Sequence, residues 1–277
     1  MKIIFNHQAI DEENLLIKYT EHSLFSGDYV QAFCWFFQKK LLFWEDVYFQ
    51  LMASMRKMRM EIPQNFTPEL FEKEIVDLIN ENLSTQGTVK ITVFRKSDSA
   101  VDYVSEILPY KNFIELQDNE LDIYKEINIF PNLLSGIYIF QPVNLPARKY
   151  AQENDLQEVI ILNDKKNIAR AVSGNIFMIQ NNEIRSNPPF DGAFLSSLKK
   201  NFITFLREET DYIYREETLS PFQTQSVQEI FILSDEKGVI PVTKIRKTTF
   251  STDRTLFLVK KFIGYAVKKN SDNPNLS

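Results

Sequence analysis

The chain has 277 residues, of which 44% are hydrophobic and 25% charged, and its formal net charge is -5. This length suits two packed domains, and the negative charge argues against a general nucleic-acid binder, because neutralising phosphates requires clustered Lys and Arg. Two histidines and one cysteine exclude a His-rich or thiolate metal site and an intrachain disulfide.

The compartment expected from the sequence is the cytoplasm. No apolar run approaches the roughly 20 residues of a membrane span, and the apolar run near the N-terminus is far shorter than that of a signal peptide. The single cysteine, Cys34, lies between Phe33 and Trp35, and this apolar context predicts a small buried side chain.

The first half of the chain predicts strands mixed with two helices. Thr67 is a candidate helix cap and Pro68 suits the first turn, so a helix should begin there. In chain order we expect a strand at 2–5, a hairpin of strands 29–37 and 41–44, a helix over 47–55, a helix over 67–79, a strand at 88–94, and weaker strands at 101–108 and 113–116.

A polar, acidic stretch over 117–128 follows, and we interpret residues 119–125 as an interdomain linker. Beyond it we expect helices at 145–154, 193–209 and 253–268, strands at 158–162, 175–180, 211–215 and 229–233, a turn at Asn181-Asn182, and a frayed tail. Strands and helices alternate irregularly in both halves. The predicted class is therefore α+β, with domains over 1–118 and 126–277.

Several local segments follow one another in a recognisable order. They are Phe25 with Gly27-Asp28, the helix segment Val47–Leu51, the helix and strand Ala147–Asn163, the strand Gly174–Ile179, the strand Val227–Ser234, and Pro241-Val242. In this order the chain resembles the class IV aminotransferases, which include D-amino-acid and branched-chain aminotransferases and 4-amino-4-deoxychorismate lyase. The resemblance implies their two-domain α+β fold, a homodimer, and a pyridoxal-phosphate cofactor held by a lysine.

The lysine implied by the resemblance is missing. In the family it lies ten to thirteen residues before the helix that here begins at Ala147, which places Leu134 or Ile137 at the position. The stretch 126–148 contains no lysine; Lys125 and Lys149 flank it. The lysine forms the Schiff base with the cofactor and shuttles the proton, so no catalytic residue can be assigned.

The other cofactor contacts implied by the resemblance differ as well. Gln50 stands where the family has a phosphate-binding Arg, and Arg170, five residues before Asn175, stands where an acid bonds the pyridine nitrogen. The phosphate-binding turn is Ser196-Ser197-Leu198-Lys199, and a second phosphate loop is Ser234-Asp235-Glu236, whose carboxylates would repel a dianion. The expected vestigial cleft therefore comprises Gln50, Arg170, Asn175, Ser196, Ser197, Lys199, Ser234 and Asp235. We expect Arg170 to pair there with Asp235 or Glu236.

Three functional hypotheses remain. The first is a homologue that has lost pyridoxal-phosphate catalysis, needs no cofactor, and binds an unknown small molecule or protein partner. The second is an active pyridoxal-phosphate aminotransferase or lyase with a displaced lysine. The third is a cofactor-free enzyme with new chemistry. The segment 187–192 reads as a turn that borders the site in the family. Neither nucleic acid nor a membrane is an expected partner.

Overall fold

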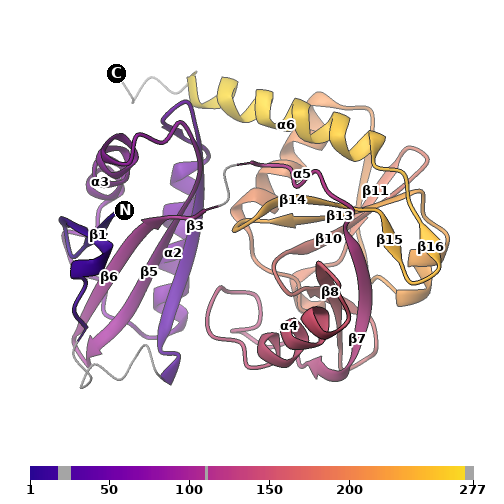
Figure 1. The fold of residues 1–277 in the computed structure, drawn as a ribbon, viewed down its shortest axis with the longest axis horizontal. Helices are drawn as coiled ribbons and strands as arrows, with labels where there is room; N and C mark the ends of the chain where they lie inside the picture. Colours follow the sequence, from indigo (N-terminus) through magenta and orange to yellow (C-terminus); the bar gives the residue numbers. More distant parts are fainter. Residues whose placement is uncertain (18–25, 110–111, 272–277) are drawn as a thin grey trace. The chain divides into compact units, whose positions relative to one another are not determined.

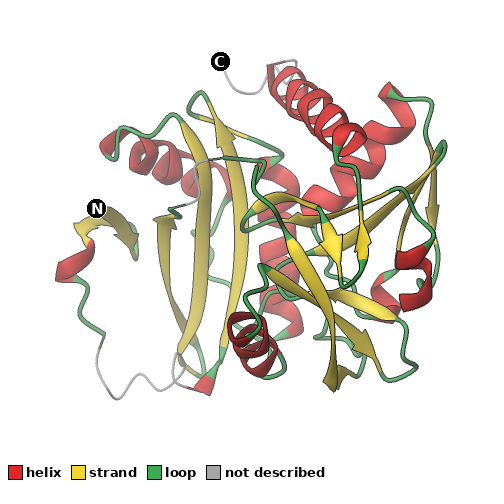
Figure 2. Ribbon diagram, turned by 45° about the vertical axis from the view of Figure 1, so that its right-hand side comes forward, coloured by secondary structure: helices red, strands yellow, loops and turns green. Residues whose placement is uncertain are grey.

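The computed structural model describes residues 1–17, 26–109 and 112–271, which divide into two units. Unit 1 contains Met1–Asn112, Ile137–Phe140 and Ala266–Ser277, and unit 2 contains Phe113–Gly136 and Gln141–Tyr265. Phe25 of the family-like segment and most of the tail predicted to fray lie outside the described residues. Both units mix helices with strands (Figure 2), as the α+β prediction requires.

Unit 1 is built on one six-stranded sheet with the order β2-β1-β6-β5-β3-β4 (Figure 1). Two amphipathic helices, α2 (Trp44–Lys57) and α3 (Pro68–Glu81), bury their apolar residues in the same core as the sheet. The remaining elements are β1 (Lys2–Phe5), β2 (Gln8–Asp11), η1 (Glu12–Asn14), β3 (Tyr29–Phe37), β4 (Lys40–Leu41), β5 (Gln86–Ser97) and β6 (Ala100–Ile107).

The predicted start of α3 is confirmed. The side chain of Thr67 accepts a hydrogen bond from the Leu70 amide at 3.3 Å, and Pro68 occupies the first helical position. Burial of Cys34 is also confirmed, since its side chain is 0% exposed. Burial raises the pKa of the Cys34 thiol far above its usual range, so this cysteine is a core residue.

The predicted hairpin is confirmed, but its second strand is shorter than expected. β3 pairs with β4 through Phe36 and Leu41, and the turn uses left-handed backbone at Gln38 and Lys39. The strand does not continue to residue 44 because Phe43 adopts a φ of 56° and α2 begins at Trp44. Acidic residues in the first turn of α2 stabilise this start through the helix dipole.

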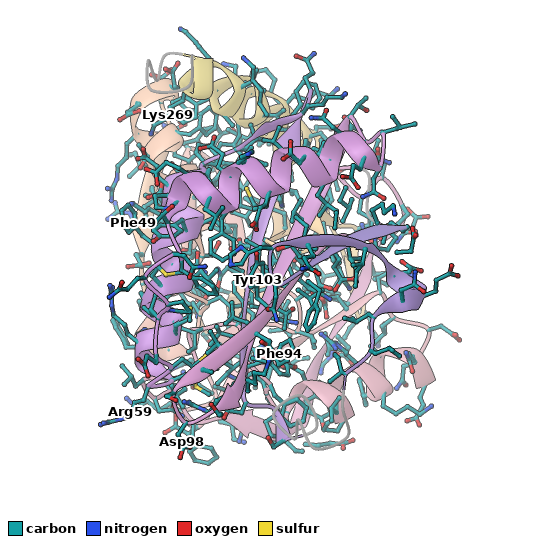
Figure 3. The ribbon with its side chains drawn as sticks, turned by 90° about the vertical axis from the view of Figure 1, so that its left-hand side faces the viewer. Phe49, Arg59, Phe94, Asp98, Tyr103 and Lys269 are labelled. Carbon is teal, nitrogen blue, oxygen red and sulfur yellow. The ribbon has the colours of Figure 1, made fainter. Side chains whose placement is uncertain are left out.

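A group of hydrogen-bonded polar side chains in unit 1 includes one buried residue. Tyr103 of β6 is 1% exposed, and its hydroxyl donates a hydrogen bond of 2.6 Å to Glu74 of α3. His7 Nδ1 lies 2.6 Å from the other oxygen of the same carboxylate. Figure 3 labels Tyr103 together with Phe94, which comes from the neighbouring strand β5. This group ties the turn between β1 and β2 to β6 and α3.

Unit 2 contains two five-stranded sheets, ordered β12-β11-β10-β13-β14 and β16-β15-β7-β8-β9. Apolar side chains from both sheets form one shared core. The strands are β7 (Glu120–Ile129), β8 (Glu158–Asn163), β9 (Ile168–Ala171), β10 (Asn175–Gln180), β11 (Glu183–Ser186), β12 (Ile213–Glu216), β13 (Glu229–Ser234), β14 (Gly238–Val242), β15 (Lys244–Ile245) and β16 (Thr248–Thr249). The helices are α4 (Asn144–Glu153), η2 (Pro189–Asp191), α5 (Ser197–Glu209), η3 (Pro221–Gln225) and α6 (Asp253–Ser271), whose residues from Ala266 onward belong to unit 1.

The predicted linker was wrong, because residues 120–129 form strand β7. Leu121 and Ile123 are buried at 1% and 7% exposure, and they alternate with polar residues on the other face. Alternation over so few positions is easily hidden by acidic neighbours. The division between the units comes earlier, after Asn112.

Other predictions differ in smaller ways. Residues 113–116 form no strand; Ile114 makes one isolated bridge to Val239. The helix expected from residue 193 begins at Ser197, because Ser196 caps it. The pattern did not predict the short strands β2, β9, β14, β15 and β16. No helix among the described residues combines the length and apolarity needed to cross a bilayer.

Candidate functional site

Unit 2 contains all of the predicted site residues except Gln50, and Phe194 contacts two of them. The guanidinium of Arg170 lies 4.3 Å from the centre of the Phe194 ring. The Asn175 side chain binds the main chain of Phe194 twice, donating to its carbonyl at 3.2 Å and accepting from its amide at 2.8 Å. Phe194 was not predicted as a site residue, because nothing local distinguishes it from a core aromatic.

Arg170 on β9 is buried, with 0% of its surface exposed. Its guanidinium donates hydrogen bonds to the carbonyls of Ala171 at 3.0 Å and Val172 at 3.2 Å, and to the Asn144 side chain at 2.9 Å. Asn144 begins helix α4 and was also missed. The side chain is thus buried within unit 2. Its place in a cofactor cleft and its pairing with Asp235 or Glu236 stay predictions.

The N-terminus of α5 carries a carboxylate from another strand. Ser196 is the N-cap, and its hydroxyl accepts a hydrogen bond from the Lys199 amide at 2.9 Å. The same hydroxyl donates a hydrogen bond to Asp235, which is 1% exposed and follows β13. A helix N-terminus attracts anions through its free amides and its dipole. In this structure the anion beside the cap is the protein's own Asp235.

The loop that follows β13 and carries Asp235 is held by hydrogen bonds of Ser234, the last residue of that strand. The Ser234 hydroxyl donates to the Ser173 carbonyl at 2.8 Å and accepts from the Lys237 amide at 3.0 Å. The Ser173 amide in turn donates to the buried Glu158 carboxylate at 3.1 Å. Ser234 therefore stabilises the loop that carries Asp235. Ser197, in the first turn of α5, is 5% exposed.

Lys199 is buried at the start of α5, but its ammonium group contacts neither Ser196 nor Asp235 in the hydrogen bonds and ion pairs described for it. Nζ donates to the Asn187 carbonyl at 2.6 Å and lies 3.1 Å from a Glu216 oxygen. Burial lowers the pKa of Lys199, and the Glu216 charge opposes this shift. Asn187 opens the predicted turn, which the structure confirms as η2 ending at Gly192 with a φ of 105°.

The two candidate positions for the lysine fall in different units. Leu134 lies in a turn of unit 2, where its amide donates to the Asn132 side chain at 2.8 Å. Ile137 belongs to unit 1 and is 2% exposed. Gln50, on α2, also belongs to unit 1 and is half-buried. No group of three or more His, Cys, Asp or Glu residues suited to a metal ion occurs within the described residues.

Comparison with known proteins identifies the family. Residues 33–245 match the family described as Amino-transferase class IV. The chain belongs to the class IV aminotransferases. A D-alanine aminotransferase from Staphylococcus epidermidis is 20% identical over 260 residues, covering 88% of this chain and 89% of the relative.

Solved structures of class IV aminotransferases share the fold. The branched-chain aminotransferase of Escherichia coli matches with a TM-score of 0.85 and 16% identity, over 99% of this chain and 96% of the other. The branched-chain aminotransferase of Thermobaculum terrenum in its PLP form matches with a TM-score of 0.79 and 16% identity, over 96% and 93%. The two-domain α+β fold of the class IV aminotransferases is thus confirmed, while identities this low carry no further activity over to this chain.

The residues that the resemblance implies for a pyridoxal-phosphate site differ in this chain. The segment 126–148 offers no amine for a Schiff base. The Asp235 carboxylate stands beside the α5 cap, and a phosphate dianion would be repelled there. Arg170, at the position that the resemblance assigns to the acid that bonds the ring nitrogen, is a buried cation.

Proposed function

We propose that this chain is a class IV aminotransferase homologue that has lost pyridoxal-phosphate catalysis and acts by binding a small molecule or a protein partner. The observation that carries the proposal is the lack of a lysine anywhere in the segment 126–148. Transamination passes through a covalent bond between the cofactor and an amine. Without that amine, neither the covalent attachment nor the proton transfer that it performs is available.

The buried charges of unit 2 support the same proposal. Arg170 donates three hydrogen bonds, to two main-chain carbonyls and Asn144, so its guanidinium stabilises the local backbone. Asp235 binds the cap of α5, so this N-terminus already has a negative partner. Both arrangements give structural roles to positions that would otherwise contact the cofactor.

The experiment is a spectroscopic titration with pyridoxal phosphate, with a D-alanine aminotransferase as the positive control. We expect no absorbance band of an internal aldimine, no stoichiometric lysine adduct after borohydride reduction and peptide mapping, and no cofactor-dependent rise in melting temperature. A stoichiometric phosphopyridoxyl-lysine in unit 2 would overturn the proposal.

A second candidate function is an active pyridoxal-phosphate enzyme with a displaced lysine, and Lys199 is the observation in its favour. Lys199 is 4% exposed, and burial lowers the pKa of its amine, which favours a nucleophilic neutral form. However, Nζ is bound to the Asn187 carbonyl and Glu216. The same peptide mapping distinguishes the two candidate functions, because under this alternative the adduct would be found on Lys199.

We also propose a homodimer, which the family membership supports, and a cytoplasmic location, which rests on the sequence alone. Light scattering of the purified chain tests the dimer directly. A mass of one 32.5 kDa chain at micromolar concentration would contradict it.

A further inference from the structure

Unit 2 contains a pocket of about 620 Å³ that shares no residue with the predicted cofactor site. Its apolar wall includes Ile123 of β7, Leu162 of β8 and Ile245 of β15. These three side chains are buried members of the core between the two sheets. The pocket therefore reaches from the surface to the apolar interior of this unit, and its volume is in the range of small-molecule sites.

Four basic side chains line the same pocket: Lys125, Lys166, Arg246 and Lys247. The lining includes no Asp or Glu. Arg246 forms an ion pair with Asp122, beside the pocket. Across the part of the chain that the structure describes, no carboxylate forms an ion pair with the other three ammonium groups. We call this pocket the basic pocket. Its twelve lining residues are Ile123, Lys125, Leu162, Lys166, Pro221, Phe222, Thr224, Gln225, Ile245, Arg246, Lys247 and Thr248.

The charge of the basic pocket is unlike that of the chain as a whole. The protein has 37 acidic and 32 basic residues, so a lining with four basic residues and no acid is a local reversal of sign. Apolar walls of low dielectric strengthen the field of charges at the mouth of a pocket. Such a pocket attracts anions and rejects cations.

An exposed aromatic ring adds to the apolar surface. Phe222, on η3, is 79% exposed and lines the basic pocket. An apolar group placed between this ring and the wall of Ile123 and Ile245 would be removed from water on both sides, which stabilises binding roughly in proportion to the area buried. The pocket thus offers an apolar floor and wall with cations at the mouth.

We propose that the basic pocket binds a small organic acid with an apolar body. The body packs against Ile123, Leu162, Ile245 and the Phe222 ring. Its carboxylate accepts hydrogen bonds from the ammonium groups of Lys125, Lys166 and Lys247, which replace the hydration of the anion by charge-assisted bonds. This site is independent of the cofactor question, because it uses none of Arg170, Ser196, Lys199 or Asp235.

The experiment uses the fluorescent amphipathic anion 8-anilinonaphthalene-1-sulfonate as the probe and octanoate as the competitor. We expect saturable fluorescence enhancement with one site per chain, and displacement by octanoate at lower concentration than by neutral 1-octanol. Replacing Lys125, Lys166 and Lys247 together by Gln should weaken probe and octanoate binding by about tenfold or more.

The matched control replaces Lys165, Lys237 and Lys260, which lie in unit 2 outside the basic pocket, by Gln. This control changes the net charge by the same amount as the replacement of Lys125, Lys166 and Lys247. It should leave the affinities for the probe and for octanoate within about twofold of the wild-type values. Thr248→Trp fills the pocket with a ring instead of altering its charge, and should also abolish binding. Equal weakening in both lysine triples, or binding that Thr248→Trp leaves intact in a folded protein, would overturn the proposal.

Discussion

Ser196 and Asp235 meet at the N-terminus of α5, where the serine hydroxyl caps the helix and donates a hydrogen bond to the carboxylate. Both side chains are buried, at 7% and 1% exposure. Thirty-nine residues separate them in sequence. The pair therefore fixes the loop after β13 against the start of the helix.

Ser196→Ala should lower the free energy of unfolding by about 1–2 kcal/mol, since it removes a helix cap and one partner of a buried carboxylate. Urea unfolding followed by circular dichroism measures the loss. Ser226→Ala, at an exposed serine after η3, is the control and should change stability little. Equal effects at the two serines would show that the cap contributes nothing.

Arg170→Glu should lower the free energy of unfolding by about 3 kcal/mol or more. The new carboxylate would face the carbonyls of Ala171 and Val172 in a buried position, where an uncompensated charge is costly. Arg148→Glu, at an exposed position of α4, makes the same charge change without burial. Near-wild-type stability of Arg170→Glu would mean that the guanidinium does not hold this backbone.

The lowered pKa of Lys199 predicts a pH-dependent stability. The folded protein releases the Lys199 proton at lower pH than the unfolded chain does, so the unfolded state binds more protons between the two pKa values. Stability should therefore rise with pH through that window, which ends near the ordinary lysine value of about 10.4. Thermal melts of the wild type and Lys199→Met from pH 7 to 11 test this. As the pH rises, the melting temperature of the wild type should increase relative to that of the variant. A constant difference between the two melting temperatures would contradict the pKa shift.

Restoring the lysine alone should not restore cofactor binding. Leu134→Lys, or Ile137→Lys, supplies the amine but leaves Arg170 and the altered phosphate contacts in place. Charge-assisted contacts contribute roughly 1.5–3 kcal/mol each, so several missing ones weaken binding by orders of magnitude. We expect Leu134→Lys combined with Arg170→Glu, Gln50→Arg and Lys199→Arg to bind pyridoxal phosphate measurably better, if that protein folds. Absorbance titration compares the variants, and tight binding by Leu134→Lys alone would refute the argument.

Tyr103→Phe should destabilise unit 1 by about 1–3 kcal/mol, because it removes the hydroxyl that binds Glu74 and accepts from the His7 amide. Tyr212→Phe is the control, since within the described residues its hydroxyl makes no hydrogen bond while its amide does. Differential scanning calorimetry measures both. A loss at Tyr103 no larger than at Tyr212 would show that the Tyr103 hydroxyl is dispensable for stability.

The sequence by itself determined the family, the α+β class and most of the larger elements, because these rest on local patterns. Thr67-Pro68 predicts the start of α3, and the apolar run of residues 158–162 predicts β8. The missing lysine is likewise a fact of sequence. The sequence did not predict strand β7, because the burial of Leu121 and Ile123 depends on the pairing of β7 with β8 and β15.

Only the tertiary structure decided what the site residues touch. Arg170 contacts Phe194 and Asn144, and Asp235 contacts Ser196, across separations of more than twenty residues. The basic pocket likewise joins side chains from β7, the turn after β8, η3 and the β15–β16 hairpin. Such contacts depend on how sheets and loops pack, and local periodicity carries no information about that packing.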